Sequence, residues 1–150
     1  MKKYNVFGIG NALVDCVYMV DDKFLDDNNI EKGLMTLVDE KKQKSIIEKI
    51  KNFDSVIQSG GSVTNSVYTL SQLGGSGYVS VLVAEDKFGK IYLDQINQYN
   101  VLSKIAQGKG ATGTSIILIT PDAERTMNTH LGMCRAVSYT HLTLPTSDLV

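Results

Sequence analysis

The stretch that most constrains the fold covers residues 59–75 and reads SGGSVTNSVYTLSQLGG. Its apolar residues recur at helical spacing and predict an amphipathic helix with one buried stripe, formed by Val63, Val67, Leu70 and Leu73. The closing glycine pair predicts a left-handed C-cap that ends this helix. The opening pair has no Cβ atoms, so a ligand can approach the backbone where the first helical N–H groups lack partners.

Gly60, Gly61 and Asn65 are therefore candidate ligand-binding residues. The Asn65 amide offers two donors and an acceptor to a polyhydroxylated ligand. The helix N-terminus also favours hydroxyls or partial negative charge. The alternative is that the glycine pair forms only a tight turn between a strand and a helix.

Composition limits the class of protein. The 150 residues suffice for one domain with a real core, and 43% hydrophobic and 21% charged residues are typical of a soluble protein. A net charge of −1 gives no electrostatic reason for nucleic-acid binding. No run of about 18 apolar residues predicts a membrane span, and the N-terminus shows no signal peptide. Two isolated cysteines indicate reduced thiols, so we expect a cytoplasmic protein.

Strand and helix patterns alternate along the chain, which indicates an α/β fold. The helices are expected over residues 39–52, 62–73 and 88–99, and the strands over 4–9, 12–20, 33–38, 55–58, 78–83, around 105, 114–120 and 124–131. Residues 21–29 are expected to form a charged connection. The first helix should begin after Asp39 as N-cap and bury Ile46, Ile47, Ile50 and Phe53.

The Gly8-Ile9-Gly10 sequence invites comparison with the dinucleotide-binding fingerprint. That fingerprint requires a third glycine at position 13, where this chain has Leu13, and a helix must follow. The next residues are instead rich in β-branched and aromatic side chains, as in a strand. We therefore reject a nicotinamide-dependent enzyme.

Asp15 lies inside this second strand among apolar neighbours. A buried carboxylate is costly unless something hydrogen-bonds it, so Asp15 is a candidate site residue. The alternative is that Asp15 is merely an exposed aspartate near the end of a strand. Asn11 lies nearby, but in a fully extended strand the two residues would be about 13 Å apart, so both can touch one ligand only if the chain bends.

Three motifs resemble those of the PfkB-type carbohydrate kinases, which include ribokinase and adenosine kinase. They occur in the family's order as GNALVD, SGGSVTNSVYTLSQLGG and TPDAERTMNTHLG, and the resemblance covers about residues 4–134. It implies a ribokinase-like fold, in which a Rossmann-like doubly wound α/β sheet carries a small β lid, here truncated. It also implies transfer of the ATP γ-phosphoryl group, with Mg²⁺ bound to ATP, to a hydroxymethyl group of a sugar or nucleoside.

The resemblance gives roles to individual residues. Asp15 and Asn11 would bind the sugar hydroxyls, together with Gly60, Gly61 and Asn65. A carboxylate suits this role because it accepts from two donors at once. Leu34 and Met35 would be lid contacts, although core packing is the commoner fate of such side chains.

Arg125 corresponds to an arginine that lies near the transferred phosphate in adenosine-kinase-like members. A planar guanidinium suits that position because charge on the phosphoryl oxygens needs stabilising. The alternative is a surface arginine beside Glu124 and Asp122. His130 and His141 share no metal-ligand spacing with the cysteines, so no metal site is expected within the protein itself.

The resemblance also shows what this chain lacks. The family's second motif, Gly-Ala-Gly-Asp or close to it, supplies an anion hole and the catalytic base, and it does not occur in these 150 residues. We therefore expect residues 1–134 to be the sugar-binding part of a kinase, inactive alone, and residues 135–150 to be a foreign extension. The alternatives are a non-catalytic sugar- or nucleoside-binding module and an unstable orphan fragment. Family members are often homodimers paired through the lid.

Overall fold

The computed structural model describes residues 4–98 and 102–136, and only the backbone of residues 102–108. In chain order the elements are β1 (Val6–Ile9), β2 (Leu13–Met19), α1 (Asp22–Asp27), β3 (Met35–Leu37), α2 (Glu40–Ile50), β4 (Ser55–Gly60), α3 (Ser62–Gln72), β5 (Gly77–Ala84), α4 (Lys87–Gln98), β6 (Leu102–Gly108), β7 (Gly113–Ile119), β8 (Arg125–His130) and a 3-10 helix (Gly132–Ala136).

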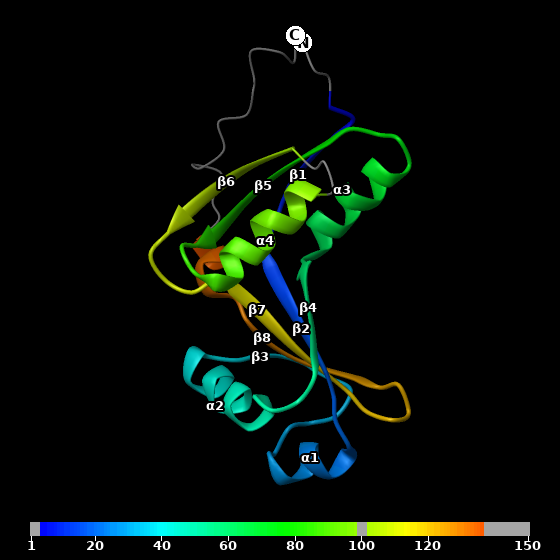
Figure 1. The fold of residues 1–150 in the computed structure, drawn as a ribbon, viewed down its shortest axis with the longest axis vertical. Coiled ribbons are helices and arrows are strands. Elements are labelled where there is room, and N and C mark those ends of the chain that lie inside the picture. The colour runs from blue at the N-terminus through cyan, green and yellow to red at the C-terminus, as the bar shows by residue number, and fades with distance from the viewer. Residues whose placement is uncertain (1–3, 99–101, 137–150) are drawn as a thin grey trace.

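The strands form two sheets. The first has the order β1-β5-β6 and is entirely parallel, and α3 and α4 pack against it. The second has the order β3-β8-β7-β2-β4 and mixes parallel and antiparallel pairs. In Figure 1 the first sheet and its two helices occupy one end of the molecule, and α1 and α2 lie at the other end. The alternating β and α pattern therefore produces the expected mixed α/β architecture.

Two apolar clusters hold these layers together. One lies between α3, α4 and the strands β2 and β5, and its buried members include Val67, Val79, Tyr92 and Ile96. The other packs α1 and α2 against the second sheet. The first cluster uses one face of β2, and the second uses the same face of β7. Among the described residues, α1–α4 therefore leave the opposite face of the second sheet uncovered.

The predicted helix ends are partly confirmed. Asp39 is the N-cap of α2, and its side chain accepts from the Lys42 backbone N–H at 2.7 Å. Gly74 has a φ of +85°, the left-handed conformation expected after α3. The predicted stripe of α3 was wrong at its end, because Leu73 is the C-cap residue and is 81% exposed.

Two further expectations are corrected. Residues 21–29 contain a helix, α1, rather than a charged connection, and Asp21 caps it by accepting from the Phe24 N–H at 2.8 Å. Phe53 was expected in the core but is 41% exposed. It follows the end of α2 and packs edge-on against Phe24, with the ring centroids 5.7 Å apart. The predicted helix over 88–99 is α4, and its last position lies outside the described residues.

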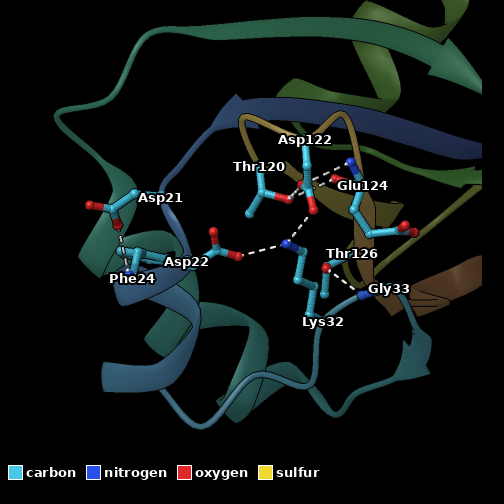
Figure 2. Close-up of polar contacts among 9 residues, drawn as sticks. All are labelled: Asp21, Asp22, Phe24, Lys32, Gly33, Thr120, Asp122, Glu124 and Thr126. Atoms are coloured by element: carbon cyan, nitrogen blue, oxygen red, sulfur yellow. Dashed lines mark hydrogen bonds and ion pairs between the residues drawn. The ribbon is translucent and has the colours of Figure 1, made fainter.

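A polar cluster ties the segment before β3 to the β7–β8 turn (Figure 2). The Lys32 ammonium bridges Asp22, at 2.7 Å, and Asp122, at 2.6 Å. The bond from Lys32 holds the pKa of Asp122 at about 2. The Gly33 N–H also donates to the Thr126 hydroxyl at 2.9 Å. These contacts, with the parallel pairing of β3 to β8, place residues 32–37 beside the β7–β8 hairpin. No helix in the described part of the chain is long and apolar enough to cross a bilayer.

Candidate functional site

Asp15 lies on the open face of the second sheet. Along β2 the side chains alternate, so that Val14 and Cys16 enter the core while Asp15 is half-buried on the other side. The register pairs Asp15 with Gln58 of β4 and with Ser115 of β7. Paired residues share a face, so these polar side chains flank the carboxylate.

The motifs GNALVD and SGGSVTNSVYTLSQLGG come into contact at Gly60. A Cβ atom at Gly60 would lie 2.5 Å from Cγ of Asp15 and 2.7 Å from its Oδ1. The Asp15 carboxylate therefore occupies the place that a side chain at position 60 would fill. The end of β4 is also held by α4, because the Ser59 N–H donates to the Gln95 side-chain oxygen. Glycine at position 60 is thus required by the position of Asp15.

Gly61 brings Asn11 to the same place. Gly61 has a φ of +95° and is the N-cap residue of α3. A Cβ atom there would meet the backbone carbonyl oxygen of Asn11. Asn11 precedes β2, so the chain before the strand lies against the start of α3. The structure therefore brings Asn11, Asp15, Gly60 and Gly61 together.

Asn65 lies in the first turn of α3, where its backbone N–H donates to the Gly61 carbonyl at 3.0 Å. Its exposed side chain lines a cavity of about 240 Å³ that also includes Gln58 and Tyr68. Gln58 pairs with Asp15 across the two strands. Asn65 and Asp15 thus share Gln58 as a neighbour, but Asp15 does not line the cavity at Asn65. A cavity of about 570 Å³ between α1 and the β7–β8 turn contains none of the predicted site residues.

Arg125 acts on Asp15 through charge. Burial raises the pKa of Asp15, and the Arg125 guanidinium opposes this by lowering it, with a net rise. Arg125 is exposed at the start of β8, opposite Ile119. Within the described part of the chain Arg125 makes no ion pair, and the nearby Asp122 in the β7–β8 turn is bound by Lys32. Its positive charge therefore remains available on the side of the sheet that Asp15 faces.

Leu34 and Met35 are on the surface rather than in the core, at 45% and 57% exposure. The register places Met35 opposite Met127 of β8, and the Leu34 carbonyl accepts from the Met127 N–H at 2.8 Å. Other exposed apolar side chains on this face belong to Met19, Leu37 and Val56. They form what we call the apolar rim: Met19, Met35, Leu37 and Val56. β3 and β4 are the two edges of this sheet, so these residues flank its open face on both sides.

The sequence analysis missed Ser115 and Thr129. Both are buried, and their hydroxyl oxygens lie 2.8 Å apart beside Asp15. Ser115 is one polar residue within an apolar strand, and nothing in the local sequence distinguishes it from a packed serine. Only the strand register places it opposite Asp15.

Comparison with known proteins adds evidence from outside the chain. The family model described as pfkB family carbohydrate kinase matches residues 34–149. Adenosine kinase from Sinorhizobium meliloti is similar with 35% identity and a TM-score of 0.83, over 94% of this chain and 43% of that one. A probable sugar kinase protein from Rhizobium etli CFN 42 is similar with 31% identity and a TM-score of 0.85, over 95% and 43%.

More distant structures share the fold. Adenosine kinase from Schistosoma mansoni, in complex with adenosine, has 23% identity and a TM-score of 0.81, over 94% of this chain and 42% of that one. The present chain thus spans less than half the length of these solved structures.

Proposed function

Because the chain belongs to the pfkB family of carbohydrate kinases, we propose that it forms the acceptor-binding part of an ATP-dependent kinase for a sugar or nucleoside hydroxyl. One observation carries the proposal: the half-buried Asp15 carboxylate lies directly against Gly60, beside the contact of Asn11 with Gly61. A half-buried carboxylate needs hydrogen-bond donors, and two vicinal hydroxyls would supply them.

The remaining site residues complete acceptor binding. Gly60 and Gly61 would shape the acceptor site by leaving room for the Asp15 carboxylate and the Asn11 backbone carbonyl beside the start of α3. Asn65 and Asn11 offer amide groups to the acceptor hydroxyls. Leu34 and the apolar rim, which includes Met35, would cover the less polar part of the acceptor. An apolar rim suits a nucleoside base, in line with the similarity to kinases described as adenosine kinases.

Arg125 would face the phosphoryl group during transfer. Bound ATP supplies that group, and a guanidinium stabilises the charge on its oxygens. The Arg125 guanidinium is exposed on the face of the sheet that Asp15 faces, which fits this role. We assign Mg²⁺ to the nucleotide, where it would bridge the phosphates of ATP. The Gly-Ala-Gly-Asp motif does not occur in the sequence, so the base that deprotonates the acceptor is not assigned to any residue here.

Several wider expectations accompany this proposal. We infer a cytoplasmic protein that acts on small molecules rather than on nucleic acid or membranes, and a homodimer through the lid. The exposed apolar rim supports the homodimer. The division into residues 1–134 and a foreign extension over 135–150 stays a prediction, because residues 137–150 lie outside the described ranges.

The test is calorimetric titration of the 150-residue chain with adenosine and with ribose. We expect Asp15→Ala to weaken binding of the preferred ligand by at least about tenfold, which is about 1.4 kcal/mol. Asp54→Ala is the control, because Asp54 is an exposed aspartate just before β4. Equal affinity of wild type and Asp15→Ala would contradict the assignment of the site.

A second candidate is a binding module without catalysis, favoured by the missing Gly-Ala-Gly-Asp motif. The two are separated by adding ATP and Mg²⁺ to the ligand-bound chain and measuring ADP. We expect binding without turnover from the 150-residue chain alone. Turnover at a rate typical of kinases would show that the missing motif is not required.

A further inference from the structure

Two side chains of α4 reach the segments on either side of the Gly60–Gly61 turn. Gln95 contacts the end of β4, before the turn, and Tyr92 contacts the first turn of α3, after it. The two residues are three positions apart on one helix, so they lie on the same face of α4. In Figure 1, α4 lies beside the point where β4 passes into α3.

The Gln95 amide binds the outer edge of β4. β4 is the last strand of the second sheet, so backbone groups on its outer side have no strand partner among the described residues. The Gln95 side-chain oxygen accepts from the Ser59 N–H, and Nε2 of Gln95 donates to the Ile57 carbonyl at 3.4 Å. One side chain thus holds the backbone on both sides of Gln58, whose neighbour across the strands is Asp15.

The Tyr92 hydroxyl holds the start of α3. It shares a hydrogen bond of 2.5 Å with the Thr64 hydroxyl, and both residues are fully buried. Gly61, the N-cap residue, has no side chain with which to cap α3. The Thr64–Tyr92 pair therefore ties this end of the helix to a second element.

The turn between these two contacts has little stiffness of its own. Glycine has more backbone freedom than any other residue, and the turn consists of two glycines, of which Gly61 adopts a φ of +95°. The Asp15 carboxylate and the Asn11 carbonyl fill the space that Cβ atoms at Gly60 and Gly61 would take. A shift of the turn would therefore displace these groups as well.

The same two contacts border the cavity at Asn65. Of its lining residues, Gln58 and Ser59 come from β4, whereas Thr64 and Asn65 come from α3. The cavity of about 240 Å³ thus lies between the two segments that α4 holds. A shift of either segment would change the width of the cavity and the position of the Asn65 amide.

We propose that Tyr92 and Gln95 are positioning residues for acceptor binding. They act through the backbone: together they fix the end of β4 and the start of α3, and thereby the places of Asp15 and Asn65. This inference rests on the proposed function, since it requires that the acceptor binds at these residues. Loss of either contact should weaken acceptor binding by more than its effect on stability explains.

The experiment titrates the 150-residue chain with adenosine and with ribose by calorimetry, and compares two near-isosteric variants. Gln95→Met removes both hydrogen bonds to β4, and Tyr92→Phe removes only the hydroxyl that meets Thr64. Because each variant loosens the turn, we expect each to raise the Kd of the more tightly bound ligand by at least about fivefold. Without ligand, hydrogen exchange should become faster at the amides of Gly60 and Asn65, on the two sides of the turn.

Two further variants of α4 are the controls. Ile96 is buried beside Gln95, and its aliphatic side chain makes no hydrogen bond. Ile96→Val should therefore lower the free energy of unfolding, measured by urea denaturation, and leave the Kd unchanged. Gln98→Met repeats the change made at Gln95 at an exposed position of the same helix and should alter neither quantity.

Asp15→Ala separates this inference from the proposed function. If Asp15→Ala loses affinity while Gln95→Met and Tyr92→Phe bind as tightly as wild type, the positioning role is overturned and the acceptor site stands. The positioning role is also overturned if Ile96→Val weakens binding as much as they do, because affinity then follows stability. If Asp15→Ala binds like wild type, or wild type binds neither ligand, the proposed function fails and this inference fails with it.

Discussion

At the residue scale, Asp15, the proposed acceptor-binding carboxylate, lowers the stability of the folded chain when it is ionised. Its folded pKa is raised mainly by burial, and the Arg125 charge offsets this only in part. A carboxyl whose folded pKa is raised stabilises the protein least when ionised, so its unfavourable contribution appears as the pH rises through that pKa. Without ligand, the ionised Asp15 carboxylate therefore opposes folding. Such a cost is typical of a binding site.

The position of the Asp15 carboxylate depends on the absence of a side chain at Gly60. Gly60→Ala would place a methyl group 2.5 Å from the Asp15 Cγ, so the carboxylate must move. We expect a loss of about 1–3 kcal/mol in the free energy of unfolding and weaker nucleoside binding, measured by urea denaturation and calorimetry. Gly74→Ala is the control: it introduces left-handed strain at φ +85° with no atom within 4 Å. It should cost stability but leave affinity unchanged. Equal affinities for wild type and Gly60→Ala would contradict the role of Gly60 in positioning the Asp15 carboxylate.

At the scale of elements, α4 is fixed to the loop before β7 by one side chain. Asp86 accepts from the Gly89 N–H at 2.7 Å, the Thr112 N–H at 2.8 Å and the Thr112 hydroxyl at 2.6 Å. Burial raises the pKa of Asp86, but these hydrogen bonds together outweigh burial and lower it. Asp86 therefore caps the start of α4 and links this helix to the loop before β7.

Replacement of Asp86 tests this connection. We expect Asp86→Ala to lower the free energy of unfolding by about 1–3 kcal/mol at pH 7, because buried N–H groups lose their acceptor. The stabilisation is present above the ordinary pKa of 3.8 and is lost as the pH falls through the lower folded value, so the difference from wild type should shrink in acid. Thermal unfolding from pH 7 to pH 3 measures it. Asp94→Ala, an exposed aspartate on the same helix, should change little; a difference that stays constant with pH would count against the ionised carboxylate.

For the whole molecule, two apolar surfaces lie at different ends. The apolar rim surrounds the open face of the second sheet, whereas the β1 edge belongs to the first sheet. We assign the apolar rim to the acceptor and to a homodimer.

The homodimer prediction belongs to this scale. We expect the chain to sediment as a dimer. Leu37 is 61% exposed and would be buried at the dimer contact, so Leu37→Asp would bury a charge there. We expect this variant to raise the dimer dissociation constant by at least about tenfold. Leu73→Asp, which alters a leucine 81% exposed at the end of α3, is the control. A dimer that persists in Leu37→Asp, or a wild-type monomer at high concentration, would refute dimerisation through the lid.

Much of the fold follows from local sequence. Periodicity and turn chemistry predicted α2 with its Asp39 cap, α3 with its left-handed end at Gly74, and the hairpin of β7 and β8. These features depend on neighbours a few residues apart, which the sequence displays directly. The same local reasoning failed for α1, where a high density of aspartates concealed the Asp21 cap.

The candidate site is a different case, because its parts are distant in sequence. The motifs singled out Asp15 and Gly60, but only strand pairing puts the carboxylate in the space that a side chain at position 60 would occupy. Ser115 joins them through a parallel register that no local pattern encodes. The sequence by itself determined the elements and the residue types of the site. The tertiary structure decided their contacts, because register and burial depend on the whole sheet.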